Sequence, residues 1–123
     1  MALTSTKFAN AVSSKVLNDE NMTNTAQLNV VDGPGSLYSC KIVNSNNAAV
    51  YVKVVFSYVF TVGSTAPDLV LSCPASSTYE YEIPGGIAFT ALSICATENA
   101  TPSDNTAPSV SGNEKIDVTL VVG

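Results

Sequence analysis

Hydrophobic and polar residues alternate along much of the chain with the period of two that is typical of β-strands. The most apolar segment spans residues 47–57, and its β-branched and aromatic residues favour a buried strand. One face of this strand, predicted to face the core, carries Val50, Val52, Val54 and Phe56. The other face carries Tyr51, Lys53 and Val55, which we expect to point outward. A strand that is apolar on both faces belongs at the centre of a packed β structure or at a subunit interface.

The same alternation, interrupted by turn residues, predicts a complete sandwich. Gly, Pro and Asn clusters at residues 32–35, 44–47 and 84–86 predict turns. The segments between such breaks predict eight strands, at residues 27–31, 37–43, 47–57, 68–73, 77–83, 87–89, 91–97 and 115–122. The predicted fold class is all-β, an eight-stranded antiparallel jelly-roll-like β-sandwich with an N-terminal arm.

The expected division of the chain is an N-terminal arm over residues 1–25 and a β-sandwich domain over residues 26–123. Phe8, Val12 and Val16 stand four residues apart in a segment that is otherwise rich in Ser, Asn, Thr and Ala. The arm is either a tail packed on its own domain or an extension that docks on a neighbouring subunit. We expect docking, with little contribution from the arm to the stability of its own sandwich.

The surface is predicted to be polar but weakly charged. Charged residues make up 12% of the 123 residues, against roughly 25% in ordinary soluble domains. Two explanations are open: other copies or partners cover much of the surface, or the chain is a compact and stable monomer.

The charged residues that are present exclude several functions. The net charge is −5, and the five basic residues are scattered lysines, so nucleic acid is not an expected partner. The chain has no His, so catalytic triads and the commonest zinc ligands are unavailable. Glu80 and Glu82 are read as a solvated strand face rather than an acid/base pair. We therefore expect no enzyme, no catalytic residue, no metal and no cofactor.

The cysteines and the hydropathy profile indicate the compartment. Cys40, Cys73 and Cys95 are widely spaced and odd in number, which favours reduced thiols in a protein that folds in a cytoplasm. One disulfide with a free thiol is the alternative. The first residues show no signal-peptide core, and no stretch approaches the ~20 apolar residues of a membrane span, so we expect no membrane partner.

The span from about Gly33 to Val122 resembles the small all-β structural proteins that tailed-phage genomes encode beside the major capsid protein. The resemblance rests on a strand opened by Leu37-Tyr38, the apolar strand 49–56, and the segments 61–71, 84–89, 92–97 and 119–122. It implies a viral capsid decoration (cement) protein that binds the major capsid protein shell and stabilises it. It also implies a jelly-roll-like homotrimer, located in the virion on the capsid surface and assembled in the host cytoplasm.

Five residues are the predicted interface for this function: Phe8, Val12, Val16, Tyr51 and Val55. The alternative function is a carbohydrate- or receptor-binding module of a phage fibre or tail. Sugar-binding modules usually present exposed aromatic residues, and this chain has no Trp. The cement protein is therefore the favoured function, and no small-molecule substrate is expected.

Overall fold

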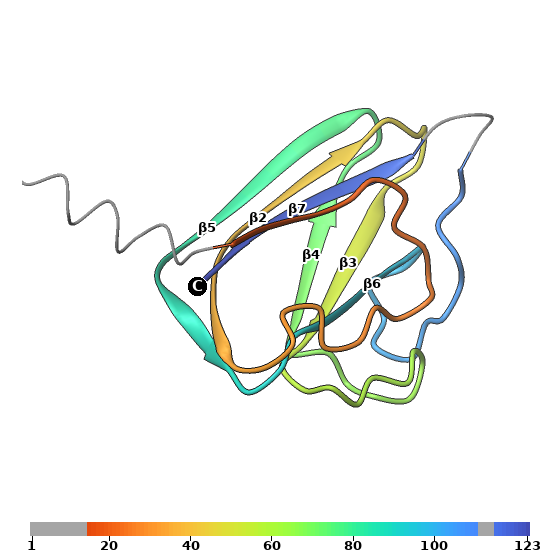
Figure 1. The fold of residues 1–123 in the computed structure, drawn as a ribbon. Helices are drawn as coiled ribbons and strands as arrows, with labels where there is room; N and C mark the ends of the chain where they lie inside the picture. Colours follow the sequence, from red (N-terminus) through yellow and green to blue (C-terminus); the bar gives the residue numbers. More distant parts are fainter. Residues whose placement is uncertain (1–14, 111–114) are drawn as a thin grey trace, which may run out of the picture.

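Seven β-strands form the fold in the computed structural model, which describes residues 15–110 and 115–123 (Figure 1). They are β1 (Lys15–Asp19), β2 (Gly35–Asn44), β3 (Val50–Val55), β4 (Leu69–Cys73), β5 (Ser77–Phe89), β6 (Ser93–Thr97) and β7 (Ile116–Val122). The described residues contain no helix. The predicted all-β sandwich is confirmed, with seven strands in place of eight.

The strands form two antiparallel sheets that pack face to face. Sheet A has the order β1-β7-β2-β5, and sheet B has the order β4-β3-β6. In Figure 1, sheet A runs along one side of the molecule and sheet B crosses behind it. Apart from the consecutive strands β3 and β4, paired strands are distant in sequence, so the fold depends on contacts between remote segments.

The core lies between the two sheets and follows the predicted alternation. Every second residue of β7 is buried, from Ile116 to Val122. Val50, Val52 and Val54 of β3 are each no more than 1% exposed and belong to the same core cluster. Since β7 and β3 belong to different sheets whose inner faces meet, these side chains form one continuous apolar layer between the sheets. Burying a Val or Leu side chain in such a layer stabilises the fold by roughly 1.5–3 kcal/mol.

The second face of β3 differs from the prediction. Lys53 and Val55 were expected to point outward, but they are 1% and 3% exposed. Val55 packs with Phe60 and Cys95 in a second, smaller core cluster. These side chains do point away from sheet A, as predicted, but the chain covers them with its own loops. The local sequence indicated that this face needs a cover, but not that the cover comes from the same chain.

β5 is one long strand where the sequence predicted two strands separated by a turn at Pro84-Gly85-Gly86. The register against β2 shifts here, from Ser39 opposite Glu82 to Leu37 opposite Ile87. Gly85 and Gly86 absorb the extra residues with φ values of 81° and 75°, and Pro84 is tolerated because β5 is an edge strand. The turn residues therefore form a bulge within one strand.

The predicted strand at residues 27–31 is reduced to a single bridge between Gln27 and Ile94 of β6. Beyond it, Val30 N–H donates to the Leu92 carbonyl. Asn29 has a φ of 49°, and its side chain accepts a hydrogen bond from Gly33 N–H, which closes a turn. The segment does approach β6, as a strand would, but the turn at Asn29 ends the pairing after a single bridge.

The predicted arm and the sandwich overlap. Residues Lys15–Asp19 form β1, which pairs along its whole length with β7. Met22 is 1% exposed within the main core cluster. Residues 15–25 are thus part of the sandwich, contrary to the expectation that residues 1–25 lie outside it. Phe8 and Val12 lie outside the described residues.

Truncating Met22 tests this assignment. We expect Met22→Ala to lower the free energy of unfolding by about 2–5 kcal/mol, because it leaves a cavity in the core. Leu28→Ala is the matched control, since Leu28 is 53% exposed, and it should change stability by no more than about 0.5 kcal/mol. Urea denaturation of both variants provides the measurement. Equal stability of the two variants would place Met22 outside the core.

Candidate functional site

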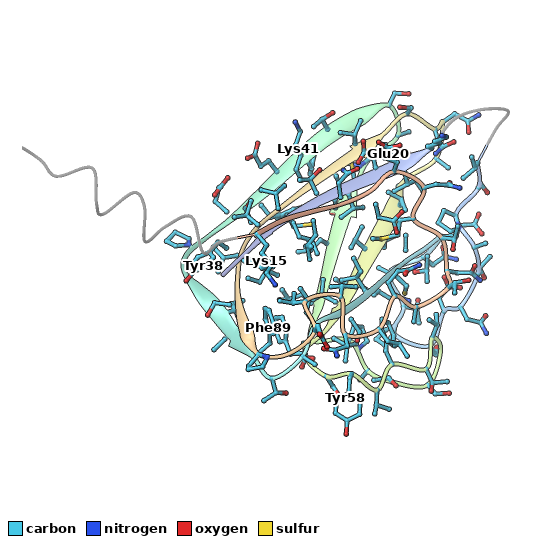
Figure 2. The ribbon with its side chains drawn as sticks, in the orientation of Figure 1. Lys15, Glu20, Tyr38, Lys41, Tyr58 and Phe89 are labelled. Atoms are coloured by element: carbon cyan, nitrogen blue, oxygen red, sulfur yellow. The ribbon has the colours of Figure 1, made fainter. Side chains whose placement is uncertain are left out.

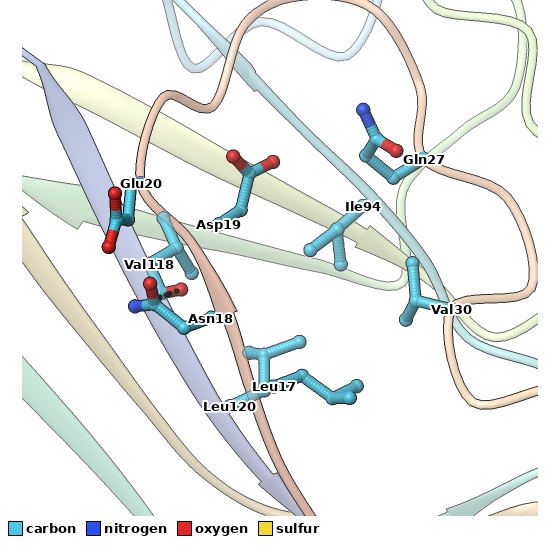
Figure 3. Close-up of a pocket in the computed structure, with 9 residues that line it drawn as sticks. All are labelled: Leu17, Asn18, Asp19, Glu20, Gln27, Val30, Ile94, Val118 and Leu120. Atoms are coloured by element: carbon cyan, nitrogen blue, oxygen red, sulfur yellow. Dashed lines mark hydrogen bonds between the residues drawn. The ribbon is translucent and has the colours of Figure 1, made fainter.

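A groove with a volume of about 540 Å³ lies between the open edges of the two sheets (Figure 3). Nine residues line it: Leu17, Asn18, Asp19, Glu20, Gln27, Val30, Ile94, Val118 and Leu120. Figure 3 shows Leu17 and Leu120 on the sheet A side, with Ile94 and Val30 across from them. This volume falls within the range of roughly 300–1,000 Å³ that is usual for ligand sites.

The groove exists because the two sheet edges diverge at this side of the sandwich. β1 is the edge strand of sheet A, and the opposite wall is the short segment bridged to β6 at Gln27. Val118 and Leu120 at its base are 1% exposed, whereas Leu17 and Val30 are half-buried. An apolar base between two strand edges suits an extended peptide better than a polar metabolite.

The upper rim of the groove is polar and acidic. Asp19 and Glu20 stand at the end of β1, and Gln27 stands on the opposite wall. The Asp19 carboxylate accepts a hydrogen bond of 3.0 Å from Asn21 N–H. Among the described residues, no group of three or more Cys, Asp or Glu side chains is placed to hold a metal ion.

The structure does not bring the predicted interface residues together. Val16 is 68% exposed on the outer face of sheet A. Tyr51 is half-buried on the outer side of sheet B, and Val55 is buried within its own domain. Val16 and Tyr51 therefore lie on opposite sides of the sandwich. Phe8 and Val12, the other two members, lie outside the described residues.

The outer face of sheet A is a broad, mixed surface. The strand registers place Lys41 at its centre, opposite Glu80 on one side and Thr119 on the other. Figure 2 shows Lys41 directed away from the sandwich. At the edge strand β1, the side-chain amide of Asn18 donates hydrogen bonds to the Asp117 carboxylate (2.6 Å) and the Thr119 hydroxyl (2.9 Å) of β7. Such a face is ordered and carries both signs of charge.

Two loops at one end of the molecule carry exposed apolar side chains. Leu28 on one loop is 53% exposed, and Tyr58 and Val59 on the other are 67% and 59% exposed. Ser93 ties their two loops together, because its hydroxyl donates to the Ser57 carbonyl and accepts from Asn29 N–H. Figure 2 shows Tyr58 at the extremity of this end.

Lys53 fixes the loop that covers sheet B. Its Nζ donates to the carbonyl oxygens of Thr101 and Asp104, at 2.7 and 2.9 Å. A buried ammonium group is costly unless its protons are bonded, and these charge-assisted bonds meet that requirement. The only charge of the central strand therefore acts as an anchor for residues 98–106.

Asp104 organises the same loop from within. Its carboxylate accepts hydrogen bonds from Asn99 N–H and the Thr106 hydroxyl, at 3.1 and 2.8 Å. Desolvation alone would raise the pKa of this carboxyl group, but the hydrogen bonds from Thr106 and Asn99 lower it. The loop therefore holds a carboxylate that stays ionised at neutral pH.

The three cysteines are free and buried. Burial raises the pKa of Cys40 to about 12, with a further contribution from Cys73. Burial also raises the pKa of Cys95 to about 11, although the Lys53 charge opposes the shift. These thiols behave as small apolar side chains rather than nucleophiles.

Glu80 and Glu82 are both exposed, as the sequence predicted for a solvated strand face. The pKa of Glu82 is raised, first by a hydrogen bond shared with Glu80 and then by desolvation and charge repulsion. The two carboxyl groups lie on the outer face of sheet A and not in the groove.

Comparisons with known proteins add no relative. No family model matches the chain, and no curated protein or solved structure shows significant similarity to it. Among the described residues, no helix is long and apolar enough to cross a membrane. The class that the fold and these surfaces define is a β-sandwich with a groove at its open edge.

The sequence analysis missed the groove residues Leu17, Val30 and Ile94. Lys15–Asp19 does not alternate, because Val16 and Leu17 are adjacent apolar residues, so the segment carried no clear strand signal for β1. No local sequence pattern indicates that these residues line one groove, because Leu17 and Ile94 are brought together only by the packing of two sheets.

Replacing Lys53 tests the loop anchor. We expect Lys53→Met to lower the free energy of unfolding by about 1–3 kcal/mol, because two carbonyl groups lose their donor. Hydrogen exchange should accelerate at the amides of Glu98, Asn99 and Asp104. Lys41→Met, on the exposed face, is the matched control. Unchanged exchange in the loop would show that other contacts hold it.

The thiols give a second prediction. We expect three reactive groups in denaturant without reductant, and slow reaction of the folded protein at pH 8. Because the folded pKa values of Cys40 and Cys95 are raised above 9.0, their stabilising contribution is complete below pH 9 and falls as pH rises towards 11. Thiol titration and the thermal midpoint between pH 8 and 11 measure both effects. A single reactive thiol in denaturant would indicate a disulfide.

Proposed function

We propose that this chain is a virion structural protein, a capsid decoration (cement) protein of a tailed phage. In this role it binds the assembled shell of the major capsid protein and adds contact area between neighbouring capsomers. The observation that supports it most is the outer face of sheet A, an ordered four-stranded surface on which Val16, Lys41, Glu80 and Glu82 are exposed. The segments that resemble phage structural proteins support the same assignment.

The strand pairing supports a jelly-roll fold. A jelly roll is a long hairpin wrapped into two sheets, so its pairs are nested: first with last, second with seventh, third with sixth and fourth with fifth. Counting the bridged segment at Gln27 as a reduced second strand, the chain has all four pairs: β1-β7, Gln27-β6, β2-β5 and β3-β4. Such double-sheet folds are common in viral capsid domains.

The composition of the surface supports binding by shape and hydrogen bonds. On sheet A, Lys41 is surrounded by Ser39, Thr119 and Glu80, with Val16 exposed at the edge strand. A mixed polar face of this kind keeps the protein soluble before it binds. This suits a protein that binds its partner only after the partner has assembled.

Self-association as a homotrimer is part of the proposal. Val16, at 68% exposure, is the predicted interface residue that is available on the surface. Val55 is buried in its own domain, so we no longer include it in the proposed contact between copies. Tyr51 is half-buried. Val16 belongs to an edge strand, where contacts between copies extend a sheet most directly.

The alternative, a carbohydrate- or receptor-binding module of a fibre or tail, has support in exposed tyrosines. Tyr58 and Tyr79 are 67% and 43% exposed. Aromatic rings of this kind can stack on sugars. Binding of the purified protein to a glycan array, without binding to capsids, would favour this alternative over the cement protein.

Capsid binding tests the favoured function. Purified protein should co-sediment with empty capsids of the phage that encodes it, and should raise the temperature at which they disrupt. We expect Lys41→Glu to raise the dissociation constant about tenfold or more, because it places a second negative charge beside Glu80 at the centre of the face.

The control for this experiment lies on the other side of the sandwich. Ala107→Glu adds a negative charge on the exposed loop beyond sheet B and should leave binding unchanged. Equal thermal midpoints for both variants would show that folding is intact. Absence of any capsid binding by the wild-type protein would overturn the proposed function.

A further inference from the structure

We propose that the groove between β1 and residues 27–30 receives residues 2–14 of a second copy of this chain. The occupant is an extended segment that pairs with the free edge of β1 and places Phe8 and Val12 towards the apolar base. The proposal names the site and the segment through which copies associate, and it extends the proposed trimer. It does not depend on capsid binding.

The groove has the form that strand addition requires. β1 is the edge strand of sheet A, so one side of its backbone has no partner strand among the described residues. Beside this edge, Leu17, Val30 and Ile94 enclose a volume of about 540 Å³ together with the base residues. Backbone hydrogen bonds along an edge and an adjacent apolar depression are the two elements of peptide recognition by β-augmentation. Exposed edges of this kind are prone to pair with another chain.

The sequence before β1 has the pattern that such a site selects. In an extended segment, Phe8, Asn10 and Val12 share one face because side chains alternate. Six residues from Lys7 to Val12 span about 20 Å when extended, close to the roughly 17 Å of the five-residue β1. The segment thus matches the length of the edge and presents apolar groups to one side.

Charge favours the same occupant. Asp19 and Glu20 make the rim of the groove negative. The net charge of the whole chain is −5, yet the only charged side chain within residues 2–14 is Lys7. On the opposite face from Phe8, the Lys7 ammonium group would remain near the solvent, where it can approach these carboxylates. The attraction adds modestly to affinity and more to orientation.

A second copy is a better source of the segment than the same chain. To fill its own groove, the segment would have to reverse between Val12 and Lys15. Only Ser13 and Ser14 are available for that turn, whereas tight two-residue hairpins strongly prefer Gly, Asn or Asp. A neighbouring chain can enter the groove without this turn, and exchange of identical segments is a low-cost route to oligomers.

Crosslinking between two populations tests the proposal. One full-length population carries Phe8→Cys and a size tag, and the other carries Val30→Cys. A short bismaleimide added to the mixture should produce covalent heterodimers at several times the yield obtained with the wild-type mixture, whose cysteines are buried. Linkage within single chains of a dilute Phe8→Cys/Val30→Cys variant would overturn the proposal in favour of the chain's own segment.

Charge substitutions give an independent measurement by sedimentation velocity. Val30→Asp and Phe8→Asp should each raise the dissociation constant of self-association about tenfold or more, since either one places a carboxylate in the apolar base. The double variant should be little worse than either single variant, because both lose the same contact. Val59→Asp is the matched control, because Val59 is 59% exposed and does not line the groove, and this variant should associate like the wild type.

The outcomes separate this inference from the proposed function. Self-association that survives Val30→Asp and Phe8→Asp, with unchanged folding by circular dichroism, would overturn the groove as the contact site. A monomeric wild type would also overturn it. Capsid binding is measured separately, so crosslinked chains that do not bind capsids would leave this inference intact and remove the cement function.

Discussion

The burial of β3 on both faces is the constraint on which the rest of the structure depends. Its inner face, with Val52 and Val54, packs against sheet A, as any sandwich strand does. Its outer face carries Lys53, and that charge can be buried only because the carbonyls of Thr101 and Asp104 accept its protons. The loop of residues 98–106 is therefore a structural requirement of the central strand. A loop held in this way buries Lys53 on the outer side of sheet B.

The two sheets are asymmetric in a way that bears on function. The outer sides of β3 and β6 are covered by loops, although Val70 of β4 stays exposed. On sheet A, Val16, Lys41 and Glu80 are exposed on the outer face, and no described segment pairs with the second edge of β1. An apolar groove next to an unpaired edge is a site for another chain, and an ordered polar face is a site for a large surface. The proposed contacts between copies and with a capsid therefore use different parts of sheet A.

Much of the fold could be predicted from the sequence where local patterns were sufficient. The alternation in residues 115–122 and the apolar run around Val52 gave strands that the structure contains. Predictions failed where pairing with a neighbouring strand decides whether a segment is a strand or a turn. Pro84-Gly85-Gly86 has the composition of a turn, but β2 continues to pair beyond it and converts it into a bulge. β1 was missed because its five residues are mostly exposed and gain their order from β7.

The sequence by itself determined the fold class, because strand periodicity and turn residues are properties of neighbouring positions. It also indicated that the three thiols are free and that no histidine chemistry is available. Only the tertiary structure decided which faces are free. Whether Val55 is surface or core depends on a loop several residues away, and whether Leu17 lines a groove depends on Ile94, far along the chain. Those contacts join remote residues, so no local pattern encodes them.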